Sequence, residues 1–167
     1  MKKILLIIAA FGVFSIQAAD MKWGIGYTSI SDDDVIYNGD SVTIGGIDLS
    51  VNFDYGNNFS SEFGIIEGIR DEDDSVSVLG VVVPYSISLG TSFYARGFYH
   101  VNDNFFINAV FGNYELEANV ANIVRLEESD TELGFGAGVQ FEVEDRTFRF
   151  MYEDVDGQGI ISLKALF

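Results

Sequence analysis

Hydrophobic and polar residues alternate along most of the chain with a period of two. In residues 131–143 (TELGFGAGVQFEV), one face carries apolar side chains from Leu133 to Val143, and the other carries glycine, glutamine and glutamate. Because successive side chains of a strand point to opposite faces of its sheet, this pattern predicts a β-strand. Seven further stretches alternate in the same way. The eight predicted strands cover residues 23–30, 46–55, 59–66, 85–100, 105–114, 131–143, 147–153 and 160–167.

The polar face of these strands collects charged residues, which bears on the question of which face points inward. In a membrane barrel the apolar face meets lipid, while small and charged residues line the lumen. A charged side chain facing lipid at mid-membrane costs ~2–4 kcal/mol, so the charges are expected inside. The predicted lumen charge network consists of Lys22, Glu62, Arg96, Glu132, Glu142, Arg149, Glu153 and Lys164.

The opposite face is expected to meet lipid. Its predicted aromatic lipid contacts are Trp23, Tyr27, Phe53, Tyr55, Phe135, Phe141, Phe148, Phe150 and Tyr152. Eight strands close into a barrel about wide enough for side chains to fill, which suits the glycines of the polar face. A soluble sandwich or a lipocalin-like barrel is the alternative. In such a protein the apolar face could point inward and the charged face outward, at no cost of placing a charge in lipid.

The N-terminal residues have the pattern of a secretory signal peptide. Lys2 and Lys3 precede an apolar run over residues 4–14, and the small residues Ala18 and Ala19 follow. Cleavage is expected after one of these two alanines. A membrane-spanning helix is the alternative, but it requires ~20 apolar residues and this run is too short.

The chain is therefore predicted to be all-β: an eight-stranded antiparallel up-and-down transmembrane β-barrel over residues 19–167, preceded by a cleaved signal peptide over residues 1–18. Tight connections alternate with longer acidic ones, as in outer-membrane barrels with short periplasmic turns and long external loops. The predicted periplasmic turns are 56–58, 101–104 and 144–146, and the predicted external loops are 31–42, 70–84 and 116–131.

One local feature of this topology is less regular. Residues 76–83 are apolar but out of phase with the strand after Pro84, which suggests a β-extension above the membrane with a bulge or break between Gly80 and Pro84. A different strand count is the alternative.

Across the turn at 144–146, side-chain phase predicts that Glu142 lies opposite Arg149, both pointing inward.

Composition limits the classes of partner and cofactor. All 26 Asp and Glu and 7 of the 9 Lys and Arg follow the signal peptide, so the mature charge is 7 − 26 = −19. This balance argues against nucleic acid, because binding phosphate needs clustered Lys and Arg. There is no Cys, which excludes disulfides and thiolate metal sites.

The chain resembles the OmpA/OmpX/opacity-type group, the porin-family outer-membrane β-barrel domain. The resemblance rests on the signal peptide, residues 94–112 (YARGFYHVNDNFFINAVFG), 134–143 (GFGAGVQFEV) and 148–155 (FRFMYEDV), and the terminal LKALF. It implies integral location in the outer membrane of a Gram-negative cell, with Phe167 read as a signal by the barrel assembly machinery. It also implies contact with outer-membrane lipid and lipopolysaccharide. These motifs specify an architecture rather than a reaction.

Candidate chemistry outside the barrel wall is sparse. The single histidine, His100, adjoins a predicted periplasmic turn without a nucleophile signature, so we interpret it as a polar residue near a turn and expect no catalysis. The acidic runs at 32–34 and 71–74 could hold Ca²⁺ or Mg²⁺, but neither has EF-hand spacing, and solvated loops are the simpler interpretation. We expect no cofactor.

The sequence thus favours a structural or surface-interaction role, such as envelope integrity or adhesion, with a host or surface ligand at the external loops. The alternative is a narrow channel for small solutes or ions, because glycines facing the lumen could leave water-filled gaps.

Overall fold

The computed structural model describes residues 20–32, 42–78, 80–121 and 124–167. Its strands are β1 Asp20–Asp32, β2 Val42–Asp54, β3 Phe59–Arg70, β4 Glu72–Val78, β5 Val81–Leu89, β6 Ser92–His100, β7 Phe105–Val120, β8 Val124–Val143, β9 Arg146–Val155 and β10 Gln158–Leu166. The predicted signal peptide, residues 1–18, lies outside the described residues. Over the described part of the chain, no helix is long and apolar enough to cross a membrane.

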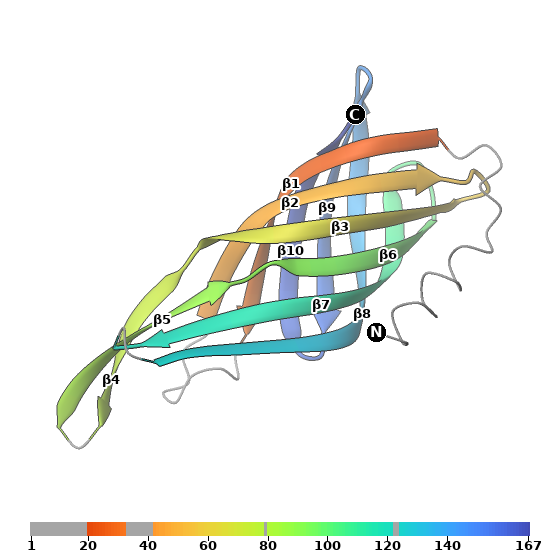
Figure 1. Ribbon diagram of the computed structural model, residues 1–167. Coiled ribbons are helices and arrows are strands. Elements are labelled where there is room, and N and C mark those ends of the chain that lie inside the picture. The colour runs from red at the N-terminus through yellow and green to blue at the C-terminus, as the bar shows by residue number, and fades with distance from the viewer. Residues whose placement is uncertain (1–19, 33–41, 79, 122–123) are drawn as a thin grey trace.

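Eight of the strands close into a barrel (Figure 1). Antiparallel pairing runs in the order β7-β6-β3-β2-β1-β10-β9-β8, and β8 pairs with β7 to complete the ring. At the seam, the last residue pairs with the first strand: Trp23 and Phe167 exchange two backbone hydrogen bonds of 3.0 and 2.8 Å. The prediction of an eight-stranded antiparallel up-and-down barrel is confirmed.

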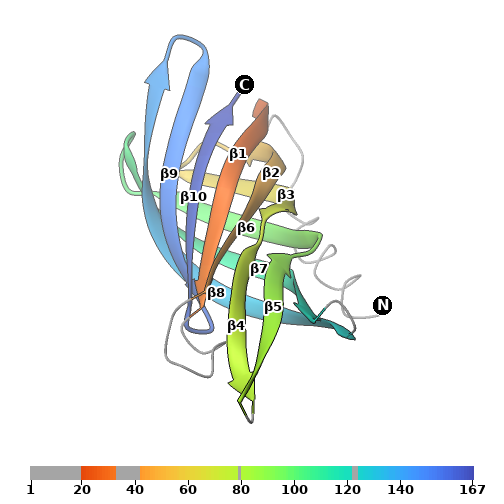
Figure 2. The same cartoon turned by 90° about the vertical axis from the view of Figure 1, so that its left-hand side faces the viewer.

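The two remaining strands form a hairpin that projects from one end of the barrel and comes toward the viewer in Figure 2. β4 pairs with β5, and β5 continues the sheet by pairing with the end of β7. The chain reverses at Gly80, whose φ of +81° is one that glycine adopts without steric cost. Residues 76–78 and 81–83 therefore extend the sheet as expected. The predicted break is this turn, while Pro84 lies within β5 opposite Ser75.

The predicted strand at 85–100 is wrong in its phase over residues 85–89, whereas Phe93 and Tyr99 point outward as predicted. It is divided into β5 and β6, which both pair with β7: Leu89 lies opposite Leu116, and Phe93 lies opposite Asn113. Four residue steps on this side match three on β7, so one extra residue is inserted as a β-bulge. A one-residue insertion exchanges the two faces. Ile87 and Leu89, predicted to point outward, are therefore buried at 6% and 4% exposure.

The predicted loop at 116–131 is also mostly strand. β7 continues to Val120 and β8 starts at Val124, so the two strands pair along their whole projecting ends. The charges of this segment suggested a loop, but alternation continues along the end of β7: Leu116 and Ala118 pack against the larger apolar cluster, and Glu117 lies on the opposite face.

The turn between β8 and β9 is shorter than predicted. Only Glu144 and Asp145 are unpaired, and Val143 lies opposite Arg146. Glu144 takes a positive φ of 57°, as two-residue hairpin turns require. The predicted pairing of Glu142 with Arg149 is therefore wrong: Glu142 lies opposite Thr147, and Arg149 lies opposite Gln140. The register moves by two residues, so both side chains keep their predicted faces.

The outside and inside of the barrel differ in polarity in the sense opposite to that of a soluble protein. Exposed residues of the outer wall include Trp23 at 62% and Phe135 at 65%. Tyr27, Phe141, Phe150 and Tyr152 are also exposed, and Phe53, Tyr55 and Phe148 are half-buried. The lumen holds buried polar and charged side chains together with two apolar clusters.

Candidate functional site in the barrel lumen

Six charged side chains from five strands meet in the lumen and make up what we term the lumen charge cluster. None is more than 2% exposed. Its members are Asp48 of β2, Glu62 of β3, Arg96 of β6, Arg149 and Glu153 of β9, and Lys164 of β10. Three acids face three bases, so the cluster is balanced in charge. Balance is necessary, because an unpaired charge at such a depth carries a desolvation penalty of several kcal/mol.

Arg96 and Glu153 form the most directional contact of the cluster. Arg96 donates from Nε to Glu153 Oε1 at 2.8 Å and from Nη2 to Glu153 Oε2 at 2.6 Å. Such two-pronged guanidinium–carboxylate pairs fix orientation as well as charge. The third nitrogen, Nη1, donates to Glu62 Oε1 at 3.0 Å. The guanidinium also lies over the ring of Tyr94, 3.9 Å from its centroid.

Glu62 is the acceptor shared by all three bases. Lys164 Nζ donates to Glu62 Oε1 at 2.6 Å, and Arg149 Nη1 donates to Glu62 Oε2 at 3.2 Å. Lys164 also reaches Asp48 at 2.8 Å and bonds the hydroxyl of Tyr94. Tyr94 in turn donates to Asp48 at 2.5 Å. These shared contacts join strands on opposite sides of the ring through the lumen.

Two glycines on the lumen face let these side chains meet. Gly26 of β1 lies between Asp48 on β2 and Lys164 on β10, and a Cβ on it would come within 2.6 Å of Lys164 Cγ. Gly136 of β8 lies in the same way between Asn108 and Glu153, which are hydrogen-bonded across it. In each case the missing side chain lets residues two strands apart come into contact.

Apolar layers lie on both sides of the cluster along the barrel axis. Toward the projecting sheet, the larger layer includes Ile30, Ile44, Ile66, Val155 and Ile160, all at most 2% exposed. Toward the tight turns lie Phe98, Phe106 and Met151. Arg149 lies over the ring of Phe98, 4.3 Å from its centroid.

Side chains also fill the space above glycines that face the lumen. Ser50 lies over Gly24, and Phe106 and Met151 lie over Gly138. This packing weighs against the channel alternative, since the glycines do not leave the water-filled gaps on which it depended.

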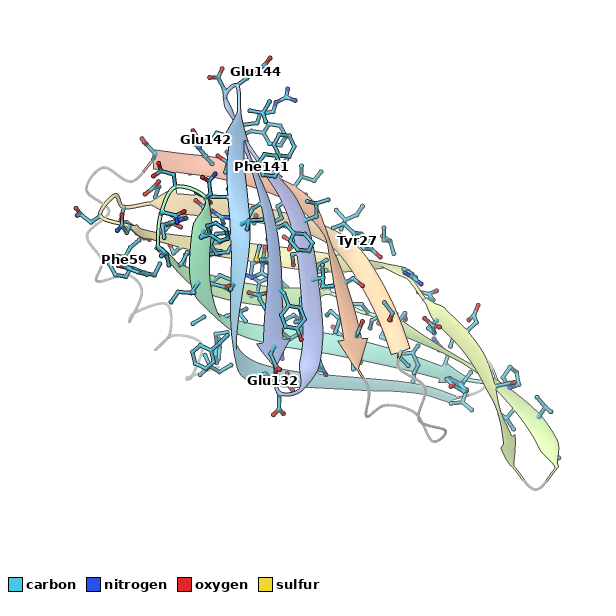
Figure 3. All side chains as sticks on the ribbon, turned by 180° about the vertical axis from the view of Figure 1, so that it is seen from behind. Tyr27, Phe59, Glu132, Phe141, Glu142 and Glu144 are labelled. Atoms are coloured by element: carbon cyan, nitrogen blue, oxygen red, sulfur yellow. The ribbon has the colours of Figure 1, made fainter. Side chains whose placement is uncertain are left out.

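The predicted charge network divides into two groups. Glu62, Arg96, Arg149, Glu153 and Lys164 meet in the cluster. Lys22, Glu132 and Glu142 do not. Lys22 Nζ donates to Thr147 at 2.9 Å and lies 3.7 Å from Glu142, whose side chain is 72% exposed at the barrel mouth. Glu132 is half-buried near the middle of β8, two residues before the pairing with β9 begins, and lies far from Glu142 in Figure 3.

Sequence reasoning missed Asp48 and the neutral partners Tyr94, Asn108 and Gln140. Asp48 was recoverable, because it lies on the polar face of the strand at 46–55. Tyr94 and Asn108 also fall on predicted polar faces, but alternation gives no depth along the barrel axis. It therefore cannot tell a residue at the cluster from one at the mouth.

His100 lies at the turn end of the lumen. Its Nε2 is 2.9 Å from Ser60 Oγ, and its ring packs against Phe98 and Phe106. Within the described residues, no hydrogen-bonding partner reaches His100 Nδ1. A serine–histidine pair used for nucleophilic catalysis needs a group that orients the ring for proton transfer, and this pair shows none.

No group of three or more His, Cys, Asp or Glu residues in the described part of the chain is arranged to hold a metal ion. Of the predicted acidic runs, Asp33 and Asp34 lie outside the described residues, and Asp71 and Asp73 are exposed.

Solved structures of other proteins share this architecture. No family model and no curated protein sequence matches the chain. Ail, the attachment invasion locus protein of Yersinia pestis, in complex with the heparin analogue sucrose octasulfate, aligns with a TM-score of 0.58 at 18% identity, over 90% of this chain and 97% of that one. A second crystal structure of Ail aligns with a TM-score of 0.53 at 14% identity, with the same coverage of both chains. The backbone structure of Ail in a phospholipid bilayer nanodisc aligns with a TM-score of 0.50 at 20% identity, over 90% of this chain and 99% of that one.

The chain has the fold of a small outer-membrane β-barrel. At these identities the likeness establishes the fold. The hydrogen bonds of the lumen charge cluster connect β2, β3, β6, β9 and β10 in addition to the backbone ladder.

Proposed function

We propose that the chain is an integral outer-membrane protein with a non-catalytic surface-interaction role. Residues 1–18 direct it through the inner membrane, and the assembly machinery reads Phe167. One observation carries the membrane part of the proposal: the outer wall is apolar, whereas six charged side chains are buried in the lumen. In water that arrangement would bury ions while exposing aromatic rings. In a bilayer it places each group in a favourable medium.

The projecting sheet supports a surface role over a purely structural one. β4, β5 and the ends of β7 and β8 extend beyond the ring, with β4 at one edge of the sheet. At the other edge, β8 pairs with β9 only from Gly134 onward. A sheet with free edges at an external end presents backbone groups and side chains to a partner.

Charge narrows the class of partner. The Ail complex contains a heparin analogue, which is a polyanion. In this chain Asp71, just before β4, and Asp73 of β4 are both exposed, and the end of β7 carries Glu115 and Glu117. Acidic groups repel polysulfated ligands. We therefore propose a basic or neutral partner, or an anionic surface such as lipopolysaccharide reached through divalent ions.

Fractionation and binding together test the proposal. Urea washing of membranes should leave an integral barrel in the pellet, whereas release into the supernatant would show a soluble barrel. Intact cells expressing the chain should then bind a cationic polymer more strongly than heparin. Deleting the hairpin residues 72–81 should reduce that binding, while the barrel keeps its altered gel mobility without boiling. Equal binding with and without the hairpin would contradict the surface role.

A further inference from the structure

A groove crosses the outer wall near the tight turns. Its floor is a row of small outward residues on three neighbouring strands: Ser61 of β3 lies opposite Gly97 of β6, which lies opposite Ala109 of β7. Larger side chains surround this floor. The groove has a volume of about 580 Å³ and is lined by Tyr55, Phe59, Ser60, Ser61, Gly97, Phe98, Tyr99, Ile107, Asn108, Ala109 and Phe135.

The groove is open rather than filled by the protein itself. A Cβ built on Gly97 would meet no atom within 4 Å, unlike the glycines of the lumen face, where neighbouring side chains occupy that space. The rings of Phe59 and Tyr99 pack together at 5.2 Å along one side. Phe59 points away from the barrel in Figure 3. Phe135, 65% exposed, lies opposite Ala109 and ends the row.

The chemistry of the lining calls for an apolar occupant. No charged residue contributes to it. The hydroxyls of Tyr55 and Ser61 hydrogen-bond to each other at 2.7 Å, so this pair is already satisfied. In the hydrocarbon of a bilayer there is no water to fill such a space, and an empty groove loses dispersion contacts.

The size of the groove argues against a protein partner. Stable protein interfaces use roughly 20–30 residues on each side, and this groove has eleven. Its volume falls within the range of small-molecule sites, ~300–1,000 Å³.

We propose that this groove binds one acyl chain of a phospholipid. The inference rests on the proposed membrane location. Phe59 begins β3 directly after the turn at 56–58, and Tyr99 lies next to the end of β6 before the turn at 101–104. In the proposed topology these turns face the periplasm, so the groove opens to the inner leaflet, whose lipids are phospholipids. The tyrosines at its rim suit the boundary between chains and headgroups.

The test compares the wild-type chain with two variants of the outer wall. Gly97→Leu fills the groove, and the open space above Gly97 predicts that it folds. Ala137→Leu adds a similar side chain at an exposed outward position of β8 that does not line the groove. If Gly97→Leu fails to reach the folded gel mobility, Ala109→Leu fills the same floor from β7.

Each protein is reconstituted into vesicles of phosphatidylethanolamine and phosphatidylglycerol, extracted into mild detergent and examined by native mass spectrometry. The wild type and Ala137→Leu should retain about one phospholipid per barrel, in line with the groove volume, whereas Gly97→Leu should retain almost none. Equal retention by all three proteins, or none by the wild type, would overturn the proposal.

Other occupants would appear as different masses. A dimer lost in Gly97→Leu would assign the groove to a second copy of the chain, and retained lipid A from vesicles that also contain lipopolysaccharide would assign it to the other leaflet. Either result overturns the phospholipid. Resistance to urea extraction is scored in parallel. A wild type that fails to insert contradicts the proposed function itself, whereas an inserted barrel without bound lipid contradicts only the groove.

Discussion

At the scale of single residues, Glu62 is the side chain on which the lumen charge cluster depends most. It accepts hydrogen bonds from Arg96, Lys164 and Arg149. Glu62→Ala leaves three cations facing two acids in a site closed to water. Removing one partner of a buried pair costs ~3–5 kcal/mol, so this variant should unfold at much lower urea concentration. Loss of the folded gel mobility on urea titration in vesicles measures the change.

A double-mutant cycle identifies the acidic partner of Arg149. Arg149→Ala combined with Glu62→Ala leaves two cations and two acids, so the double variant should be more stable than the sum of the single losses predicts. Arg149→Ala combined with Glu142→Ala is the control, because Glu142 lies at the exposed mouth and contacts Lys22 instead. That pair should be additive within ~0.5 kcal/mol. Coupling to Glu142 but not to Glu62 would reject the register of β8 and β9.

At the scale of elements, the bulge between β5 and β6 sets which side chains enter the lumen. The chain has no cysteine, so single cysteines report on each face without background. Phe93→Cys should react with a lipid-soluble maleimide, because Phe93 is 56% exposed on the outer wall. Leu89→Cys should be protected, because Leu89 is buried in the apolar layer. Equal reactivity would mean that the strand continues in one phase from 85 to 100, without a bulge.

The phase of β8 makes a second prediction at this scale. Phe135 points outward and is 65% exposed, whereas its neighbour Gly134 is buried. Phe135→Arg places a charge toward lipid at a cost of ~2–4 kcal/mol and should reduce insertion, whereas Phe135→Leu should be mild. The fraction resistant to urea extraction measures insertion. If both variants inserted equally, this strand would not contact hydrocarbon.

The same strands show which features of the fold could be predicted from the sequence. Strict alternation located all eight barrel strands, because a buried or lipid-facing row enforces a period of two. It failed at Ile87 and Leu89, since a bulge of one residue carries no compositional mark other than Gly90. It also placed Glu142 opposite Arg149, which is wrong. Alternation predicts which face of the sheet a side chain is on, but the residue opposite it depends on the length of the turn. Alternation places Asp48 and Tyr94 on polar faces, but their meeting in the cluster depends on contacts between distant strands, which no local pattern encodes.

At the scale of the whole molecule, a direct test can show which end of the barrel faces the cell exterior. The projecting hairpin turns at Gly80, and the opposite end turns at Asn57, where φ is +51°. If the projecting sheet faces outside, an epitope inserted after Gly80 should bind antibody on intact cells. An epitope after Asn57 should require permeabilised cells. The reverse pattern would invert the barrel and move the lipid groove to the outer leaflet.

The closure of the barrel gives the last prediction. Phe167 pairs with Trp23 through two backbone hydrogen bonds, and Arg146 lies 5.3 Å from the centroid of its ring. Phe167→Asp keeps the backbone bonds but removes the ring that the assembly machinery is proposed to read. Folded barrel in cells, scored by gel mobility without boiling, should therefore fall. Unassisted refolding into vesicles should change little, because the ring is half exposed and contributes little packing. Arg146→Ala is the control: it removes the ring's contact with the guanidinium but leaves the terminal aromatic in place, so cellular yield should stay normal. A parallel fall of Phe167→Asp in cells and in vesicles would show that the residue acts through the seam, and not as an assembly signal.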